Sequence, residues 1–417
     1  MTTVYIVGAG LAGLACAVDL AAQGRRVVVY ERAGHAGGRC RSYVDPVLGR
    51  SVDNGNHLLL SGNRSAMAYV ARIGARATFF EAPEAVFPFV DLATGGRWSL
   101  RPNRGRLPWW LMCTGRRAPG TKAADYLTGL RLARAGAADT VADCLKSSQN
   151  ALARFWEPLT VAVLNTAIDE GAAKLLWPVL METFGRGGAA CRPLIARDGL
   201  SASLVDPALA FLATRGIRPA FGQGLKRLEI GDGRVVGLLF GDRKVDVAPD
   251  DRVVLAVPPK ALSELCPQIP VPQGSRPIVG AHFRLDEPAD PHTPVFFMGL
   301  IGGLAHWLFV RGDVASVTIS AAGALVDAPA DDIARRIWTD AAQALGRDPA
   351  RMPAWRVIKE RRATFAQVPA ALSRRPGPQS PLANMFLAGD WTATGLPATI
   401  ESAVRSGQRA ARLVLAL

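Results

Sequence analysis

The chain has 417 residues, more than one compact core usually holds, so we expect two domains. Hydrophobic residues make up 49% and charged residues 20%, which excludes an intrinsically disordered protein. The net charge of +14 favours anionic partners such as nucleic acid, acidic lipid or phosphorylated ligands. The six cysteines include no C-x-x-C pair, and the five histidines show no metal-ligand spacing. We therefore expect no metal site and no disulfide framework, and no apolar run is long enough to predict a spanning helix.

The first thirty residues predict a strand, a glycine turn, a helix and a second strand. Residues 4–7 are β-rich, and Gly-Ala-Gly-Leu-Ala-Gly follows at 8–13. Apolar residues then recur at helical spacing over 14–21, and 26–30 form the next strand, which ends at Glu31. This order is typical of a Rossmann-like unit that binds a dinucleotide.

Each residue of this motif has a physical reason to be there. Gly8 permits the tight turn, Gly10 lets the backbone approach a pyrophosphate, and Gly13 lets the helix pack on the strand. The helix N-terminus, which includes Ala12, stabilises phosphate charge. Glu31, 23 positions after Gly8, is placed to accept hydrogen bonds from a ribose.

A second glycine element bears on whether the dinucleotide is NAD or FAD. Residues 32–39 read Arg-Ala-Gly-His-Ala-Gly-Gly-Arg, which places Arg32, Gly37, Gly38 and Arg39 directly after the second strand. The stretch resembles the second cofactor signature of the flavin amine oxidase and carotenoid desaturase superfamily. There the glycine pair lets the chain pass close to the dinucleotide and the arginine offers it charge, so the resemblance implies FAD. A flexible basic loop is the structural alternative.

A third cofactor element is predicted near the C-terminus, where a strand over 384–388 ends in Gly389 and Asp390. The aspartate can accept hydrogen bonds from ribityl or pyrophosphate-side groups of a flavin. A helix from 398 to about 415 follows, and its free N–H groups at Ala398, Thr399 and Ile400 suit the flavin N1–C2=O edge. An ordinary loop aspartate and helix start would give the same pattern.

Further strands are predicted over 235–240 and 252–257. The expected fold class is α/β, with a Rossmann-like FAD-binding domain and a discontinuous α+β substrate domain, as in the flavin amine oxidases. We expect the FAD-binding domain at 1–75, 200–265 and 380–417, and the substrate and membrane-contact domain at 76–199 and 266–379.

Two stretches sharpen the resemblance: Asp-Asn-Gly-Asn-His-Leu-Leu-Leu at 53–60, and the segment 387–407 that begins Leu-Ala-Gly-Asp-Trp-Thr. They are similar to the hydroxysqualene dehydroxylases, the squalene-associated flavoproteins of bacterial hopanoid synthesis. The resemblance adds Gly55, Asn56 and His57 to the cofactor-binding set, although this family more often carries Gln where the chain has Asn56.

What the resemblance implies is the reduction of hydroxysqualene to squalene, in which the allylic hydroxyl leaves as water and reduced flavin supplies a hydride. This chemistry needs a general acid and a dry tunnel. The candidate acids are His57, Asp53, Lys359 and Glu401. Each has a structural alternative: a buried histidine, a loop brace, a solvated charged run and a helix cap, respectively.

The segment 97–134 carries nine Arg or Lys residues and one acid, Asp125, around the pair Trp109-Trp110. Paired tryptophans beside clustered arginines suit contact with anionic lipid, which predicts a cytoplasmic protein held peripherally on the inner face of the membrane. A solvated basic face with core tryptophans is the alternative. No nucleic-acid-binding motif accompanies the segment, so we expect no nucleic acid partner.

Three other functions stay open at this stage. A flavin amine oxidase would share the fold, and a carotenoid-type desaturase would also share the substrate class with the hydride moving the other way. A flavin-bound carrier of isoprenoids would bind without turnover. No second nucleotide motif is apparent, so a separate electron donor for the flavin is a further hypothesis.

Overall fold

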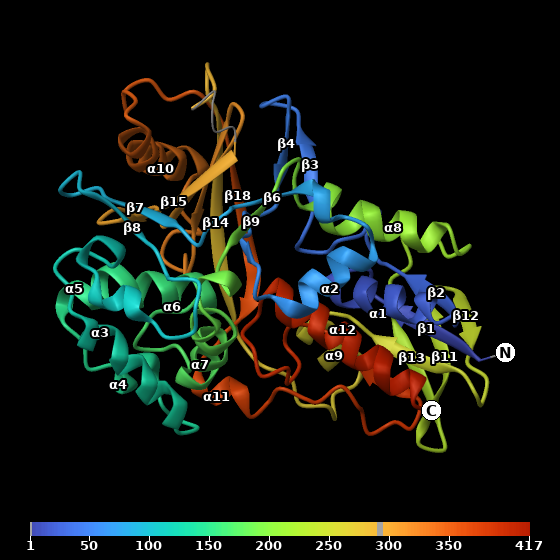
Figure 1. The fold of residues 1–417 in the computed structure, drawn as a ribbon. Coiled ribbons are helices and arrows are strands. Elements are labelled where there is room, and N and C mark those ends of the chain that lie inside the picture. Colours follow the sequence, from blue (N-terminus) through green and yellow to red (C-terminus); the bar gives the residue numbers. More distant parts are fainter. Residues whose placement is uncertain (1, 290–294) are drawn as a thin grey trace.

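The structure is a computed structural model that describes residues 2–289 and 295–417. Residue 1 of the predicted FAD-binding domain and residues 290–294 of the predicted substrate domain lie outside the described residues. A parallel sheet occupies one half of the molecule (Figure 1). Its strands follow the order β19 (Met385–Leu387), β13 (Arg252–Leu255), β1 (Thr3–Val7) and β2 (Arg26–Tyr30).

The parallel sheet is covered on both faces, and its strands are mostly apolar, as is usual for parallel sheets. Side chains alternate along β1, so Val4 and Ile6 pack under α1 (Leu11–Ala22) and α12 (Ile400–Leu415). Tyr5 and Val7 face the opposite layer, which contains β10 (Arg227–Gly231), β11 (Arg234–Phe240), β12 (Arg243–Asp246) and α9 (Pro259–Leu265). The predicted strands at 4–7, 26–30, 235–240, 252–257 and 384–388 and the two predicted helices are confirmed, with small shifts at their ends.

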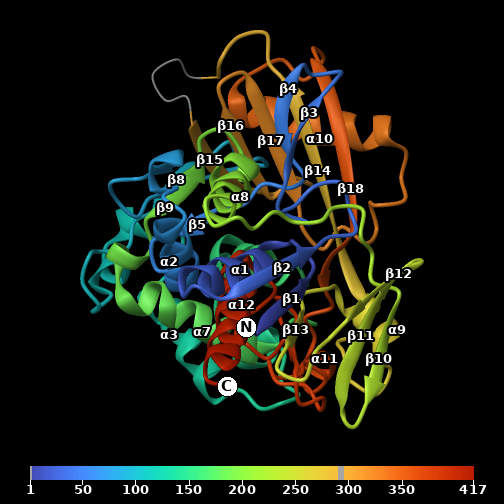
Figure 2. The ribbon, with the colours of Figure 1, turned by 90° about the vertical axis from the view of Figure 1, so that its right-hand side faces the viewer.

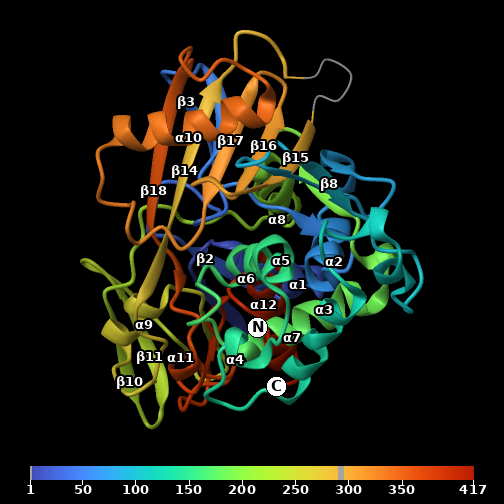
Figure 3. The same ribbon diagram turned by 90° about the vertical axis from the view of Figure 1, so that its left-hand side faces the viewer.

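A seven-stranded sheet fills the other half. Its order is β18 (Ala354–Phe365), β14 (Ser275–Arg284), β17 (Val314–Ile319), β16 (Trp307–Arg311), β15 (Val295–Ile301), β7 (Phe87–Asp91) and β8 (Arg97–Leu100). The helix α10 (Ala330–Leu345) covers one face, where it packs on apolar side chains such as Val279 and Phe283 (Figure 3). We call the opposite face the inner face.

Short helices pack beside the inner face of this sheet and form a helical layer at the lower left of Figure 1. They are α3 (Ala123–Leu127), α4 (Val141–Cys144), α5 (Gln149–Ala151), α6 (Glu157–Leu164) and α7 (Ala173–Glu182). The remaining elements are the hairpin β3–β4 (Ser42–Asp45 and Arg50–Asp53), the small sheet β5–β9–β6 (Leu59–Leu60, Pro193–Ala196, Phe79–Glu81), and α2 (Arg64–Arg72), α8 (Asp206–Ala213) and α11 (Pro369–Leu372).

The chain passes between the two halves several times. All strands of the parallel sheet come from the three segments predicted for the FAD-binding domain, and all strands of the seven-stranded sheet come from the other two. The small sheet β5–β9–β6 joins residues from both sets, so the division into domains stays a proposal. Both chain ends lie near the parallel sheet (Figure 2). Among the described residues, no helix has the length and apolar character needed to cross a membrane.

Candidate functional site

The glycine turn after β1 combines two tight contacts with one open position. A Cβ at Gly13 would lie 1.9 Å from the carbonyl oxygen of Gly8, and Gly8 itself has φ of +108°, so neither position accepts a side chain. A Cβ at Gly10 would meet no atom within 4 Å. The turn therefore closes tightly on strand and helix, and it leaves space beside Gly10 where a pyrophosphate can approach the backbone.

The second glycine element packs directly on the first. The N–H of Gly37 donates to the carbonyl of Ala9 at 2.8 Å, and a Cβ at Gly38 would lie 3.4 Å from the Cα of Gly10. Glu31 is held at this junction because its carboxylate accepts hydrogen bonds from the N–H groups of Ala9 and Ala33, at 2.7 and 2.8 Å. Arg32 is exposed beside them. The structure thus brings the two predicted elements together.

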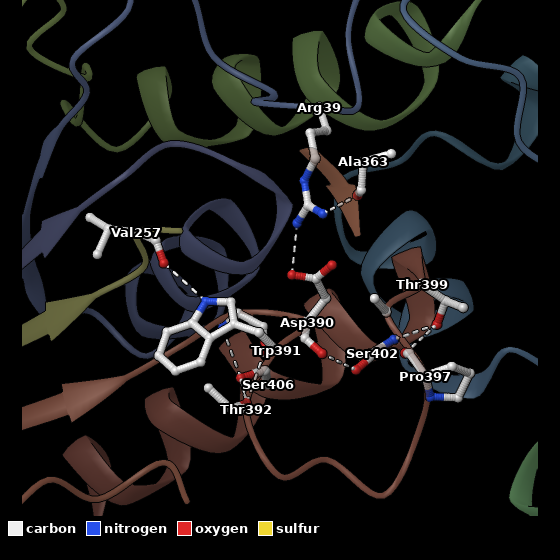
Figure 4. A network of polar contacts seen from close by, with 12 residues as sticks. Arg39, Val257, Ala363, Asp390, Trp391, Thr392, Pro397, Thr399, Ser402 and Ser406 are labelled. Carbon is white, nitrogen blue, oxygen red and sulfur yellow. Dashed lines mark hydrogen bonds and ion pairs between the residues drawn. The ribbon is translucent and has the colours of Figure 1, made fainter. Parts of the chain in front are cut away.

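Arg39 reaches from this element to the third one (Figure 4). Its guanidinium lies 2.7 Å from Asp390 Oδ1 and donates to the carbonyl oxygen of Ala363 at 2.5 Å. The Asp390 carboxylate raises the pKa of Arg39 further, so the Arg39 guanidinium is charged at any ordinary pH. A cation from the second element and an anion from the third therefore meet at the end of the parallel sheet, where β19 stops.

The sequence reasoning missed a buried arginine that supports the third element. The Arg375 guanidinium donates to the carbonyl oxygens of Asp390, Trp391 and Thr392 at 2.5 to 3.3 Å. Burial lowers its pKa to about 10, so it stays charged at neutral pH. Arg375 could not be found from the sequence. Its partners are backbone carbonyl oxygens, which every residue has, so no pattern of residue types marks it.

The N-terminus of α12 offers donors that the protein does not use. The Thr399 side chain accepts from the N–H of Ser402, and the N–H of Ala398 donates to Gln367. Among the described residues, the N–H groups of Thr399, Ile400 and Glu401 have no acceptor. These free donors, the helix dipole and the open space at Gly10 fit a dinucleotide with a ring that becomes anionic on reduction, as FAD does.

The loop 53–57 lies against the inner face of the seven-stranded sheet, where three strands hold it. The carbonyl of Asp53 accepts from His282 Nε2 on β14 at 3.0 Å. Asn54 donates to the Glu360 carboxylate on β18 at 3.2 Å, and Asn56 donates to the Thr318 hydroxyl on β17 at 3.1 Å. The loop that carries Gly55 and His57 is thereby fixed between the glycine elements and the sheet.

Two of the candidate acids are occupied by structural contacts. Asp53 is buried, pairs with Arg311 at 2.8 Å and accepts from the Ser42 hydroxyl and the Leu200 N–H. Glu401 is buried as well, pairs with Arg405, and accepts from the N–H groups of Ser65 and Ala66 at the start of α2. The oxygens of both carboxylates are thus engaged by donors of the protein itself. Their geometry supports structural rather than catalytic roles.

Lys359 points away from the loop 53–57, because successive side chains of a β-strand point to opposite faces of the sheet. It pairs with Val279 in register and its Nζ donates to the carbonyl of Ala328 near α10, so it lies on the outer face of the sheet. Glu360, one residue later, lies on the inner face and contacts Asn54. The structure therefore does not bring Lys359 to the other predicted residues, and it adds Glu360 to them.

His57 is the exposed residue of the loop 53–57. Desolvation by the surrounding protein lowers the pKa of its imidazole; the charge of Asp53 acts in the opposite direction, and that of Arg39 lowers the pKa as well. His57 is therefore mostly neutral at pH 7.

The parallel sheet, the two glycine elements and the unused donors of α12 define the class: a flavin-dependent oxidoreductase. The family described as "Flavin containing amine oxidoreductase" matches residues 11–415. The structure of a putrescine oxidase superimposes with a TM-score of 0.71 over 100% of this chain and 99% of that chain, at 16% identity, which shows the shared fold.

Two relatives of similar length indicate a narrower family within this one. A hydroxysqualene dehydroxylase of Rhodopseudomonas palustris is 48% identical over 99% of this chain and 98% of its own length. A hydroxysqualene dehydroxylase of Sinorhizobium fredii is 45% identical over the same shares. The chain belongs to the flavin containing amine oxidoreductases and, within them, to the hydroxysqualene dehydroxylase family.

Proposed function

We propose that this enzyme reduces hydroxysqualene to squalene in squalene and hopanoid synthesis. The observation that carries the proposal is the full-length identity of 42 to 48% to three proteins named hydroxysqualene dehydroxylase. The site agrees with it, because the glycine elements and the free N–H groups of α12 suit FAD, and the loop 53–57 carries an accessible histidine.

The reaction balances with one proton and one hydride. The allylic C–O bond breaks as its oxygen takes a proton and leaves as water, and a C–H bond forms at the same carbon. The bound FAD, once reduced, supplies the hydride. Two electrons must then return to the flavin from a separate electron donor, which we propose because the sequence has no second nucleotide motif.

The protein's own part is to hold the reacting carbon beside the loop 53–57, to exclude water and to deliver the proton. The proton carriers that we propose are His57, which is exposed on this loop, and Glu360, which accepts from Asn54 of the same loop. A neutral His57 delivers a proton only after it takes one from solvent or a neighbour, which makes the rate rise as the pH falls below neutral.

Single-turnover reduction tests the proposal. Purified protein is photoreduced without oxygen, hydroxysqualene is added, and the lipid is extracted while the flavin absorbance is followed. Squalene together with reoxidised flavin is the expected result. Flavin that stays reduced with intact alcohol would contradict the proposal; bleaching of oxidised flavin by squalene or phytoene would indicate a desaturase, and amine-dependent peroxide release an amine oxidase.

We further propose that residues 97–134 contact the anionic inner face of the membrane. None of the nine basic residues of this segment forms an ion pair within residues 2–289 and 295–417. Arg116 stacks over the Trp109 ring at 4.8 Å, whereas Trp110 is buried, so only one of the two tryptophans is available to lipid. Large apolar side chains stand exposed among these charges: Leu107, Trp109, Met112, Leu127 and Leu130.

Vesicle binding tests this contact. The double variant Arg104→Glu/Arg106→Glu reverses two exposed charges, and Arg215→Glu/Arg218→Glu makes the same change in net charge in the segment after α8. Each basic residue near an anionic surface contributes about 1 kcal/mol, so the first variant is expected to bind phosphatidylserine vesicles at least tenfold more weakly than the second. Equal binding of both variants would refute the contact.

A further inference from the structure

A pocket of about 340 Å³ opens at the edge of the seven-stranded sheet, where β8 is the last strand (Figure 3). Its lining comes from β7, β8, β15, Arg101 directly after β8, and Gly115. Among the described residues, the lining includes two arginines and no carboxylate, and it includes no residue of the glycine elements or of α12. The pocket is therefore separate from the cofactor elements, and its charge is positive.

Three side chains with hydrogen-bond donors share one side of β8. Residues 97, 99 and 101 alternate along the chain, so their side chains point to the same face, and all three line the pocket. Arg97 is fixed by a hydrogen bond from its Nη2 to the carbonyl oxygen of Ala344 at 2.6 Å, which leaves its other N–H groups for a ligand. Within residues 2–289 and 295–417, the Arg101 guanidinium has no hydrogen-bond or ion-pair partner.

The backbone adds a donor at the same edge. Backbone groups of an edge strand point alternately toward the sheet and away from it. The N–H of Arg101 points away, since it donates to the carbonyl of Arg116 at 2.9 Å, whereas the carbonyl of Gly96 accepts from the N–H of Asp91 beside β7. The N–H of Ser99, two residues before Arg101, therefore also points away, and in the described part of the chain it has no acceptor beyond the sheet.

These donors suit a phosphate group that is joined to an apolar molecule. Guanidinium groups bind phosphate oxygens through charge-assisted hydrogen bonds, and hydroxyl and amide N–H groups complete such sites. Phe89, Trp98 and Met298 line the same pocket, and the rings of Phe89 and Trp98 are stacked with centroids 5.7 Å apart. A phospholipid has both features, because its phosphate adjoins glycerol and acyl carbons.

Arg116 links the pocket to the exposed apolar side chains of the basic segment. Its Nη1 donates to the carbonyl oxygen of Arg101 at 3.1 Å, and its guanidinium lies 4.8 Å from the centre of the Trp109 ring, which is 52% exposed. Met112, in the same short stretch as Gly115, is exposed as well. Tryptophan side chains at a membrane surface lie at the depth of the lipid headgroups. A bilayer that meets Trp109 therefore brings lipid phosphates to the pocket.

We propose that the pocket lined by Arg97, Ser99 and Arg101 binds the phosphate group of an anionic phospholipid. This inference rests on the proposed membrane contact of residues 97–134 and deepens it, because one lipid is held in a built site. Attraction by spread charges depends on how many basic residues are present. Binding in the pocket depends on which arginine is present.

Titration calorimetry of the FAD-loaded full chain tests the subsite, with dihexanoyl phosphatidylglycerol kept below its critical micelle concentration. Arg101→Gln removes a guanidinium without protein partners, and Arg104→Gln removes the same charge from an exposed residue outside the pocket. Arg101→Gln is expected to weaken lipid binding about tenfold, because a hydrogen bond to a charged group is lost, and Arg104→Gln less than about twofold. Equal weakening by the two variants, or no binding by wild type, would overturn the subsite.

A variant without a charge change tests the pocket itself. A Cβ at Gly115 would meet no atom within 4 Å, so Gly115→Leu is expected to fold and to fill part of the pocket. Lipid binding is expected to fall about fivefold, since the side chain takes the place of the ligand. Unchanged affinity of Gly115→Leu would speak against the subsite.

Inorganic phosphate is the second ligand, and it separates a lipid site from a site for free phosphate. It is expected to bind wild type about tenfold more weakly than the lipid, because it leaves the apolar lining in contact with water. Equal affinity for both ligands would overturn the lipid assignment.

Pelleting of wild type with phosphatidylglycerol vesicles keeps this inference distinct from the proposed membrane contact. Vesicle binding without Arg101-dependent binding of the short-chain lipid would overturn the subsite and leave the membrane contact in place. Arg101-dependent binding of the short-chain lipid without vesicle binding would support the subsite and contradict the membrane contact.

Discussion

The buried His282 makes a prediction about stability and pH. It is 1% exposed, its Nε2 lies 3.0 Å from the carbonyl oxygen of Asp53, and its Nδ1 lies 2.7 Å from the Ser316 hydroxyl. Because a carbonyl only accepts, Nε2 carries the proton and Nδ1 accepts from Ser316. The neutral ring satisfies both partners, and burial lowers the pKa of His282 to about 4.

The sign of the effect follows from the unfolded state, in which a histidine has a pKa of about 6.5. The folded-state pKa lies below that value, so the stabilisation is complete above pH 6.5 and is lost as the pH falls towards 4. The loss amounts to about 2 kcal/mol at pH 5 and about 3 kcal/mol at pH 4. Acid therefore lowers the free energy of unfolding through this one ring.

The assay compares urea unfolding of wild type, His282→Gln and His35→Gln at pH 7.5 and pH 5.0. At pH 7.5, His282→Gln is expected to be less stable than wild type by about 2 to 4 kcal/mol, since buried hydrogen bonds are lost. At pH 5.0 this difference is expected to shrink by about 2 kcal/mol. The variant at the exposed His35 corrects for general effects of losing an imidazole. A difference that is the same at both pH values would refute the reasoning.

Three further predictions concern the site. Gly13→Ala is expected to misfold, because a Cβ there would meet the Gly8 carbonyl oxygen. Gly10 borders open space, so the Gly10→Ala apoprotein is expected to melt at the wild-type temperature but to bind less flavin. Equal flavin content in Gly10→Ala and wild type would contradict this. Glu401→Gln is expected to lower stability by about 2 kcal/mol without changing turnover per bound flavin, because its contacts are structural; lost turnover at unchanged stability would make it catalytic. His57→Gln is expected to remove the rise in dehydroxylation rate below neutral pH, and a retained rise would assign the proton to another group.

The elements that sequence predicts well are those with local physical causes. The glycine turn at 8–13 is fixed by the close approach of strand and helix, and its role can be read from spacing alone. The helix at 400–415 follows from its start signal and its apolar periodicity. The pairing of Arg39 with Asp390 was not predicted, because the residues lie 351 positions apart and no local pattern links them.

The roles of individual charged residues could not be read in this way, because they depend on distant partners. Glu401 stabilises the start of a helix more than 300 positions earlier, which no local pattern indicates. Trp109 and Trp110 are neighbours in the sequence, and only packing decides that one is exposed and the other buried.

The sequence by itself determined the cofactor class, because phosphate binding by backbone groups requires glycines at set spacings. Tertiary structure alone decided which side chains reach the reaction space. Lys359 and Glu360 show why: successive residues of a strand point to opposite faces, and the face that meets the loop 53–57 depends on how the sheet packs.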